Sequence, residues 1–408
     1  MLIKRLRVSG LLSFGPKGIN LPMHNLNVLI GANGSGKSNL LEVINLFKES
    51  VSPLRSISGP VMDAGGVDEW LWKGEWNNDD SPPPAHIECV VTVPDTDGIR
   101  HSIEFYGYRN ELRLADERIE MVSSGEDPDV PSSEAPWWFY HMNGNGKALI
   151  AHLHDETGPD GEETTTQISH EELIPGASIL TQVRGPGQYR VFRHLEDQYS
   201  GIELYRNWSF GPHAQMRKPV RPDERQDRLA RSAQNLAVVV AAMDARTKKK
   251  VITVLQTLYP GIHGIHSKPV AGGNLLLHLE EEGGVEIPAS RLSDGTLRFI
   301  SLLVILLDAN PPPLIAIEEP ELGLHPDVIP KIADLLVAAS ERTQLVVTTH
   351  SRMLVDALGE YPESVIVCEK HDGESTFERL DGERMKEWLE KYSLGDLWSK
   401  GEIGGNRW

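Results

Sequence analysis

The chain has 408 residues, 39% of them hydrophobic, and a formal net charge of −19 at pH 7. This length predicts two or three domains, or one domain with a large insertion. The acidity excludes a surface that binds nucleic acid everywhere, although it leaves room for a local basic patch. Because no stretch approaches the ~20 apolar residues of a membrane span, we expect a cytoplasmic protein without membrane contacts. Cys89 and Cys368 have no metal-ligand spacing, so we expect inert core residues.

The first 50 residues alternate between apolar strands and glycine-rich turns. Residues 3–8 (IKRLRV) and 25–30 (NLNVLI) are typical of strands, and the second runs directly into GANGSGKSN and an apolar helical pattern at residues 40–49. A strand, a glycine loop and a helix in this order form the context that a phosphate-binding loop requires.

The segment Gly31 to Ser38 matches the pattern G-x-x-x-x-G-K-[ST] in full. Polyphosphate is held by main-chain N–H groups, so glycines are needed where a Cβ would block its approach. The lysine then neutralises the β and γ phosphates, the serine hydroxyl binds Mg²⁺, and the helix directs its positive end at the charge. We therefore expect an ATP and Mg²⁺ site at Asn33, Gly34, Ser35, Gly36, Lys37, Ser38 and Asn39.

Residues 51–285 predict an insertion between two halves of a nucleotide-binding fold. The stretch from 50 to 84 is rich in loops and holds Trp70, Trp72 and Trp76, which we interpret as a packing cluster. Residues 86–122 alternate as short strands, which predicts an antiparallel meander, and the acidic segments 123–136 and 154–172 predict exposed loops.

A helical region is predicted from Pro222 to Leu258, and residues 217–250 carry more basic than acidic side chains. Within it, Arg221, Arg225 and Arg228 would share one helical face. Two interpretations remain open: a groove for DNA or RNA phosphates, or a solvated face paired with neighbouring carboxylates.

Residues 286–408 return to short apolar strands separated by helices, which predicts a parallel sheet. The strand at 314–317 ends in Glu318 and Glu319, where one acid can hold hydrated Mg²⁺ and the other can orient the attacking water. The strand QLVVTT ends at His350, which we expect to contact the γ phosphate. Lys37, Glu319 and His350 are the candidate catalytic residues, and Ser38 and Glu318 are the candidate metal ligands.

The stretch LSDGTLR, residues 292–298, precedes a long apolar helix. Ser293 and Gly295 place a hydroxyl and free N–H groups at the positive end of that helix, which favours an anion. This half-site lacks its own lysine or metal, so it is useful if it closes on a phosphate held elsewhere, for instance by a second copy. The alternative is a plain helix cap.

Taken in order, GANGSGKSN, LSDGT, LIAIEEPE with LGLHP, and TTHS resemble the ABC-type ATPases, in the branch that contains RecF, SMC and OLD-type ATPases. The chain end, GGNRW, is similar to the bacterial AAA/ABC-like members of that branch. The resemblance implies an α/β fold of the P-loop NTPase type, an ABC-type head with a parallel core sheet, but it does not specify the insertion. The residue patterns predict an N-terminal antiparallel β region and a large mixed α+β insertion, and they divide the chain at residues 1–50, 51–285 and 286–408.

The resemblance also implies a homodimer in which two heads enclose two Mg-ATP, with Ser293 and Gly295 of one head at the γ phosphate of the other. Three departures stand out. Asp294 and Thr296 replace the Gly and Gln usual in transporters, and Glu318 stands where Asp is common. No glutamine occurs between Lys37 and Gln167, so the expected glutamine loop is missing or displaced.

Three functions follow from the resemblance. The first is a slow ATPase switch that controls a separately encoded effector, such as a nuclease or toxin of a phage-defence system. The second is a RecF-like DNA repair ATPase that binds DNA through residues 217–250. The third, disfavoured by the missing glutamine loop, is a transporter ATPase subunit.

Overall fold

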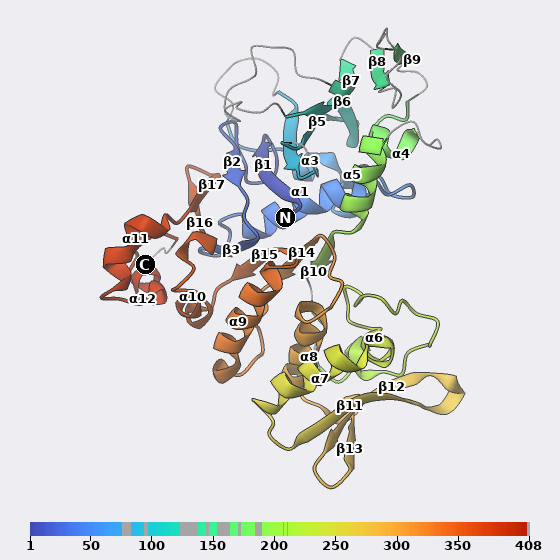
Figure 1. Ribbon diagram of the computed structural model, residues 1–408. Coiled ribbons are helices and arrows are strands. Elements are labelled where there is room, and N and C mark those ends of the chain that lie inside the picture. The colour runs from blue at the N-terminus through green and yellow to red at the C-terminus, as the bar shows by residue number, and fades with distance from the viewer. Residues whose placement is uncertain are drawn as a thin grey trace, which may run out of the picture.

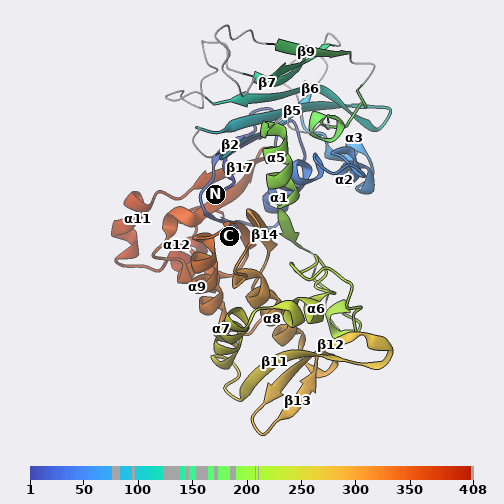
Figure 2. The same ribbon diagram turned by 45° about the vertical axis from the view of Figure 1, so that its right-hand side comes forward.

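The computed structural model describes residues 1–75, 83–93, 97–122, 138–143, 147–152, 164–169, 173–183, 190–206, 208–209 and 211–405. It confirms the predicted α/β fold, with one mostly parallel sheet, one antiparallel sheet and a small third sheet (Figure 1). Helix α1 (Lys37–Glu49) lies between the two large sheets in two views of the molecule (Figures 1 and 2).

The parallel sheet positions the candidate site. Its strands follow the order β10 (Glu203–Tyr205), β14 (Leu314–Glu318), β15 (Gln344–Thr349), β3 (Leu26–Ile30), β16 (Val365–His371) and β17 (Glu374–Arg379). Only β17 runs antiparallel to its neighbour within this sheet. Strands β3 and β15 are buried along their whole length, as expected for a sheet covered on both faces.

Alternate residues of these strands supply two separate cores. Leu29, Ala316 and Val346 pack with α1 and the antiparallel sheet. Their neighbours Val28 and Val347 pack on the opposite face, with helices α8 (Asp294–Leu306) and α9 (Ile329–Ser340). This alternation follows from the two-residue period of a strand. The parallel pairing of β14 with β15, and of β15 with β3, places the carboxyl ends of the three strands at one edge of the sheet.

The antiparallel sheet has the order β2 (Ile19–Pro22), β1 (Ile3–Ser9), β4 (Ala85–Val91), β5 (Ile99–Tyr108), β6 (Glu111–Met121), β7 (Trp138–Asn143), β8 (Lys147–His152) and β9 (Thr164–Ser169). The meander predicted for residues 86–122 is confirmed by β4, β5 and β6. Strands from both sides of residue 50 share this sheet, because β1 pairs with β4. The division of the chain at residues 50 and 285 stays a prediction.

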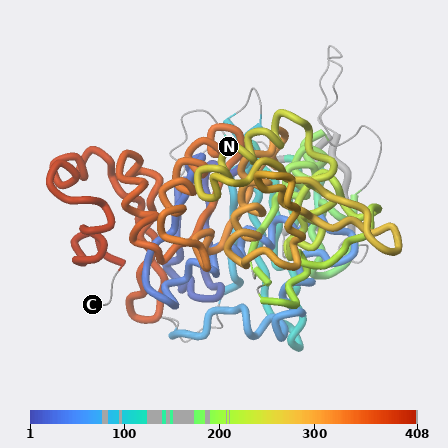
Figure 3. The backbone as a smooth tube through the Cα atoms, turned by 90° about the horizontal axis from the view of Figure 1, so that it is seen from below, coloured from blue at the N-terminus to red at the C-terminus, as the bar shows by residue number. Residues whose placement is uncertain are grey.

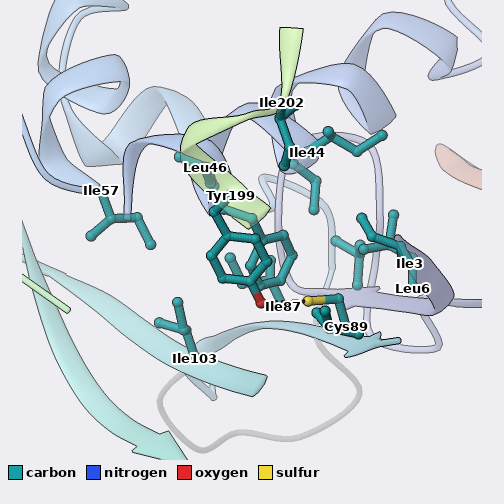
Figure 4. Close-up of a cluster of buried hydrophobic side chains, with 14 of the residues drawn as sticks. Ile3, Leu6, Ile44, Leu46, Ile57, Ile87, Cys89, Ile103, Tyr199 and Ile202 are labelled. Carbon is teal, nitrogen blue, oxygen red and sulfur yellow. Dashed lines mark hydrogen bonds between the residues drawn. The ribbon is translucent and has the colours of Figure 1, made fainter. Parts of the chain in front are cut away.

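A buried cluster joins the antiparallel sheet to α1 and α5 (Arg190–Ser200), as Figure 4 shows. Tyr199 of α5 lies at its centre, and its hydroxyl lies 3.0 Å from Cys89 Sγ. Both cysteines are buried and free, as predicted, and burial raises the pKa of each thiol.

The remaining helices surround the sheets, and their bounds are α2 (Ser58–Asp63), α3 (Val67–Trp70), α4 (Ile179–Gln182), α6 (Leu236–Ala242), α7 (Ala245–Gln256), α10 (Arg352–Ala357), α11 (Gly382–Leu389) and α12 (Leu394–Ser399). Helices α6, α7 and α8 gather with the third sheet, formed by β11 (Ile262–Pro269), β12 (Leu275–Glu281) and β13 (Val285–Pro288), on the side away from the antiparallel sheet (Figure 2). Helices α11 and α12, red in Figure 3, lie on the opposite side of the molecule from the lobe formed by α6, α7 and the third sheet. Among the described residues, every helix is too short or too polar to cross a bilayer.

The predicted helix from Pro222 to Leu258 is wrong in its first part. Residues 222–235 form turns, and the helices begin only at Leu236 and Ala245. The buried side chain of Asn235 holds these turns, because it accepts a hydrogen bond from Ala230 N and donates to the carbonyls of Arg225 and Arg228. An amide side chain that satisfies three main-chain groups offers the backbone an alternative to a helix.

Two further expectations are partly tested. The segment 154–172 was expected as a loop, but Thr164–Ser169 form β9, since a run of threonines favours a strand.

Residues 123–136 and Trp76 lie outside the described residues, as do Asn406, Arg407 and Trp408. Trp70 is buried, as expected for a packing cluster, while Trp72 is half-buried.

Candidate functional site

The phosphate loop joins β3 to α1 at the carboxyl edge of the parallel sheet. Gly31, Gly34 and Gly36 have φ angles of 148°, 79° and 98°, which favour glycine. At Gly36 a Cβ would also lie 2.3 Å from Ser375 Oγ. The loop therefore needs glycine for its conformation and, at Gly36, for its packing.

Lys37 begins α1 with its side chain curled over this loop. Its Nζ donates hydrogen bonds to the carbonyls of Gly31 at 2.8 Å and Ala32 at 3.0 Å. Burial lowers the pKa of Lys37, and the carboxylates of Glu319 and Glu318 oppose that shift. A buried ammonium group held above a glycine loop is ready to exchange carbonyl oxygens for phosphate oxygens.

The other candidate loop residues differ in what they offer to a ligand. Asn33 and Gly34 are exposed, whereas Ser35 is buried and its Oγ has no hydrogen-bond partner within the described part of the chain. The amide of Asn39 donates to Ser13 Oγ at 2.7 Å, so it anchors the loop between β1 and β2. Asn39 thus has a structural partner on the adjoining sheet.

Ser38 and Glu318 meet across the edge between α1 and β14, where the hydroxyl donates to Glu318 Oε1 at 2.5 Å. Mg²⁺ prefers oxygen ligands and usually keeps several waters and substrate phosphates in its shell. The described residues contain no cluster of three His, Cys, Asp or Glu side chains that could hold a metal. The hydroxyl of Ser38 and the carboxylate of Glu318 supply only part of a coordination shell. They therefore fit a Mg²⁺ ion whose other ligands are water and the phosphates of a bound nucleotide.

Glu319 adopts a strained backbone conformation directly after β14. Its φ is 45°, in the left-handed region that a residue with a side chain rarely enters. Its N–H donates to Thr348 O at 3.0 Å, and its Oε1 lies 3.6 Å from His350 Nε2. The two residues therefore come together, as their places at the ends of β14 and β15 predicted.

The environment of His350 favours a neutral imidazole. Burial lowers its pKa, the charge of Lys37 lowers it further, and Glu319 opposes both effects. At neutral pH a neutral ring can still donate one hydrogen bond to a phosphate oxygen.

Glu321 is a site residue that sequence reasoning missed. Its Oε1 accepts hydrogen bonds from Thr349 Oγ1 at 2.5 Å and from the N–H of His350 at 3.1 Å. Burial raises its pKa. Glu321 therefore fixes the turn that carries His350, and the only sequence signal was its place as the third acid of EEPE.

The turn before α8 is held as a helix cap. Ser293 Oγ accepts a hydrogen bond from Thr296 N at 3.0 Å, and a Cβ on Gly295 would lie 2.9 Å from Gly323 O. Asp294 binds Gly211 N at 2.9 Å and Arg217 at 2.6 Å, and the Arg217 hydrogen bond lowers its pKa. Across the described residues, no hydrogen bond or ion pair joins Ser293 or Gly295 to the phosphate loop.

Arg298 connects α8 to the strained residue Glu319. Its side chain is fully buried and donates to the main-chain carbonyls of Glu319 and, at 3.4 Å, Pro320. Its guanidinium also lies 4.9 Å from the centre of the Trp208 ring. Burial lowers the pKa of Arg298 to about 10, so the side chain stays charged at neutral pH. Arg298 is the last residue of the stretch LSDGTLR, but the sequence alone assigned it no role.

Arg206 is a second cation near the candidate site, beside the candidate metal ligand Glu318. It follows β10, the strand next to β14, and donates from Nε to Glu318 Oε2 at 3.2 Å and from Nη1 to Glu42 Oε1 at 2.6 Å. The carboxylates of Glu42 and Glu318 outweigh the lowering effect of burial on its pKa. Its role depends on strand order, which the sequence did not reveal.

Solved structures with a similar fold are SMC heads. One, an SMC head bound to the C-winged helix domain of ScpA, has a TM-score of 0.51 and 16% identity, and the match covers 94% of this chain and 99% of that one. Another, an SMC head with an extended coiled coil from Pyrococcus furiosus bound to the C-terminal domain of ScpA, has a TM-score of 0.52 and 14% identity over 95% and 98%. At these identities the likeness shows the fold alone.

A search of curated proteins gave no match. Residues 26–145 and 158–356 match the family described as "AAA domain, putative AbiEii toxin, Type IV TA system". This match spans more than half of the chain and includes the phosphate loop, the turn with Ser293 and Gly295 (called the signature turn below), Glu318, Glu319 and His350. The protein therefore belongs to this AAA family, and its P-loop NTPase fold is similar to that of SMC heads.

Proposed function

We propose that the protein binds and hydrolyses ATP with Mg²⁺, and that two copies close around two nucleotides as a switch for a separately encoded effector. The observation that carries the proposal is the convergence of Lys37, Ser38 with Glu318, and Glu319 with His350 at one edge of the parallel sheet. Family membership supports ATP as the ligand.

Each side chain has a distinct task in this proposal. Lys37 exchanges its two carbonyl partners for phosphate oxygens. Ser38 and Glu318 hold Mg²⁺, which neutralises phosphate charge when it is bound. Glu319 orients the attacking water and takes its proton, while His350 donates to the γ phosphate.

The signature turn supports closure by a second copy. Ser293 and Gly295 stand at the N-terminus of α8, where the helix dipole favours an anion, yet no hydrogen bond among the described residues joins them to the phosphate loop of the same chain. A nucleotide held by a partner's loop would complete this half-site. Hydrolysis then removes the shared γ phosphate and lets the pair separate.

Three variants test the proposal. Lys37→Ala should weaken ATP binding by about 100-fold or more, because it removes a buried cation from the phosphate site. Glu319→Gln should bind ATP normally, hydrolyse it at least about 100-fold more slowly and accumulate as a dimer. Ser293→Arg should bind ATP but stay monomeric in light scattering.

Normal hydrolysis by Glu319→Gln would show that another group activates the water. A Glu319→Gln protein that stays monomeric with saturating Mg-ATP would exclude the closed dimer.

A second candidate is a DNA-dependent ATPase, favoured by the exposed side chains of Arg246, Lys249 and Lys250 on α7. No ion pair among the described residues involves these three, whereas Arg221 and Arg225 are paired with Asp223 and Asp227. Exposed basic side chains of the segment 217–250 that have no ion pair among the described residues thus lie on α7, apart from Lys218.

Duplex DNA would stimulate hydrolysis in that case, and Lys249→Glu with Lys250→Glu would remove both the stimulation and its salt dependence. Arg221→Gln is the matched control, since its charge is already neutralised. A response that is flat across single strands, duplexes and junctions favours the effector switch.

The effector itself would be a protein. SMC heads in solved structures bind a winged-helix domain of ScpA, which supports protein docking on heads of this shape. We propose a toxin or nuclease of a defence system as the effector, and co-purification from the native host, compared between the wild type and Glu319→Gln, is the direct test.

A further inference from the structure

Arg206 divides the two oxygens of Glu318 between two tasks. Its Nε binds Oε2 at 3.2 Å, while Oε1 accepts the hydrogen bond from Ser38 at 2.5 Å. The carboxylate is therefore fixed with one oxygen turned toward Ser38, in the first turn of α1. The opposite side of the guanidinium is anchored on Glu42, one helical turn after Ser38.

Charge gives this arrangement a second consequence. The carboxylates of Glu42 and Glu318 and the guanidinium of Arg206 together carry a net charge of −1, whereas the two carboxylates alone would carry −2. The Arg206 side chain is only 20% exposed, so solvent screens it incompletely. Two neighbouring carboxylates without that cation would attract a divalent ion by themselves.

We propose that Arg206 is a positioning residue of the metal site, which aims one oxygen of Glu318 at Ser38 and keeps a free divalent cation out until a nucleotide brings one. The proposal rests on the assignment of Ser38 and Glu318 as metal ligands. It explains why a head of this type can lack a glutamine near the loop: the strand beside β14 supplies an arginine instead.

The test measures the binding of Mn²⁺ in the absence of nucleotide. The electron paramagnetic resonance signal of the free ion reports how much Mn²⁺ stays unbound. Wild-type protein without nucleotide should bind Mn²⁺ weakly. Arg206→Gln should bind it about tenfold more tightly, because one positive charge has left the pair of carboxylates. Adding Glu42→Gln to that variant restores the net charge of −1 and should return the affinity to near the wild-type value.

Arg206→Lys separates charge from geometry. It keeps the cation, so Mn²⁺ binding without nucleotide should stay within about twofold of the wild type. It loses the planar fork that orients Glu318, so hydrolysis of Mg-ATP should fall while nucleotide affinity is kept. Arg221→Gln, an exposed arginine with a local partner, controls for the loss of any arginine.

Unchanged Mn²⁺ affinity in Arg206→Gln, or a double variant that binds as tightly as the single one, overturns the proposal. Circular dichroism and thermal unfolding confirm that each variant is folded. Because no nucleotide is present, the Mn²⁺ measurement does not depend on ATPase activity. It therefore tests the role of Arg206 even if the protein proves not to hydrolyse ATP.

Discussion

Arg298 of α8 donates from its buried guanidinium to the main-chain carbonyl of Glu319. Glu319 has a φ of 45°, a conformation that costs about 1–3 kcal/mol and persists only when its surroundings hold it. Ser293 lies at the N-terminus of the same helix. One buried arginine thus joins the turn proposed to meet a partner's nucleotide to the carboxylate proposed to act in its own site.

Arg298→Met tests this connection. The variant removes the guanidinium and leaves the carbonyls of Glu319 and Pro320 without this hydrogen-bond donor. We therefore expect the free energy of unfolding in urea to fall by roughly 2–4 kcal/mol. Hydrolysis should fall at least about tenfold because Glu319 loses its fixed orientation, while ATP affinity stays within about twofold. Hydrolysis at the wild-type rate by a folded variant would contradict the assignment.

Arg342→Met is the matched control for that variant. Arg342 also donates to main-chain carbonyls, those of Leu306 and Asp308, but at the far end of α8. Because Arg342 is exposed and stands before the amino end of β15, away from the carboxyl ends that carry the candidate site, its loss should cost less stability and leave hydrolysis unchanged.

Gly36→Ala and Gly34→Ala separate packing from backbone strain in the phosphate loop. Both glycines have positive φ, 98° and 79°, so alanine costs about 1 kcal/mol at either site. Only at Gly36 would the new Cβ clash, 2.3 Å from Ser375 Oγ and 2.7 Å from Ser13 Oγ, whereas nothing lies within 4 Å at Gly34.

Gly36→Ala should therefore lower the melting temperature more than Gly34→Ala does. It should also displace the loop enough to lose nucleotide binding in calorimetry. Equal effects of the two substitutions would show that contacts with Ser13 and Ser375 do not hold the loop.

The phosphate loop was predictable because it is contiguous in the sequence. Glu319 and His350 were predictable because each directly follows a strand whose apolar run is visible, so the parallel sheet had to bring them to one edge. Arg206 and Arg298 act through strand order and burial, which single residues in a sequence do not reveal.

The helix predicted over residues 222–235 failed for a related reason. The arginines have helical spacing, but an exposed charged face has no apolar stripe to hold a helix against a core. Arg225 instead binds Asp227 at 2.8 Å and Glu203 at 2.9 Å, and Asn235 satisfies the main chain of the turns. The ion pairs of Arg225 with the nearby Asp227 and the distant Glu203 therefore stabilise turns in this segment instead of a helix.

Hydrolysis should decline in acid through His350. Its pKa is lowered from 6.5 by burial, so the ring is neutral at pH 7 and becomes charged only below pH 6.5. The imidazolium would then pair with Glu319 Oε1, 3.6 Å away, and withdraw that carboxylate from the water. The unfolded chain binds this proton more readily, so stability also falls as the pH drops below 6.5.

A profile of kcat/KM between about pH 5 and 8 checks this expectation. In His350→Asn the overall rate should fall. The decline of kcat/KM at low pH (the acid limb of the profile) should begin at a lower pH, where only carboxylates titrate. An acid limb that stays in place in His350→Asn would assign the titration to another group.

Glu117 should be a main contributor to the stability of the antiparallel sheet. Its carboxylate is 1% exposed and accepts hydrogen bonds from Ser178 Oγ, from Ile179 N at 2.8 Å and from His101 Nε2 at 3.1 Å. Glu117→Leu leaves these donors buried without an acceptor, so we expect a loss of about 3–5 kcal/mol in urea unfolding.

Glu104→Leu, on the neighbouring strand, provides the comparison for Glu117→Leu. The Glu104 side chain is 42% exposed and lies 3.4 Å from His86, so its removal should change the stability by less than about 1 kcal/mol. Nucleotide binding should survive both changes, because neither residue contacts the phosphate loop. If Glu117→Leu unfolds at the same urea concentration as Glu104→Leu, the buried hydrogen bonds do not stabilise the sheet, and the fit of apolar side chains around Tyr199 must do so instead.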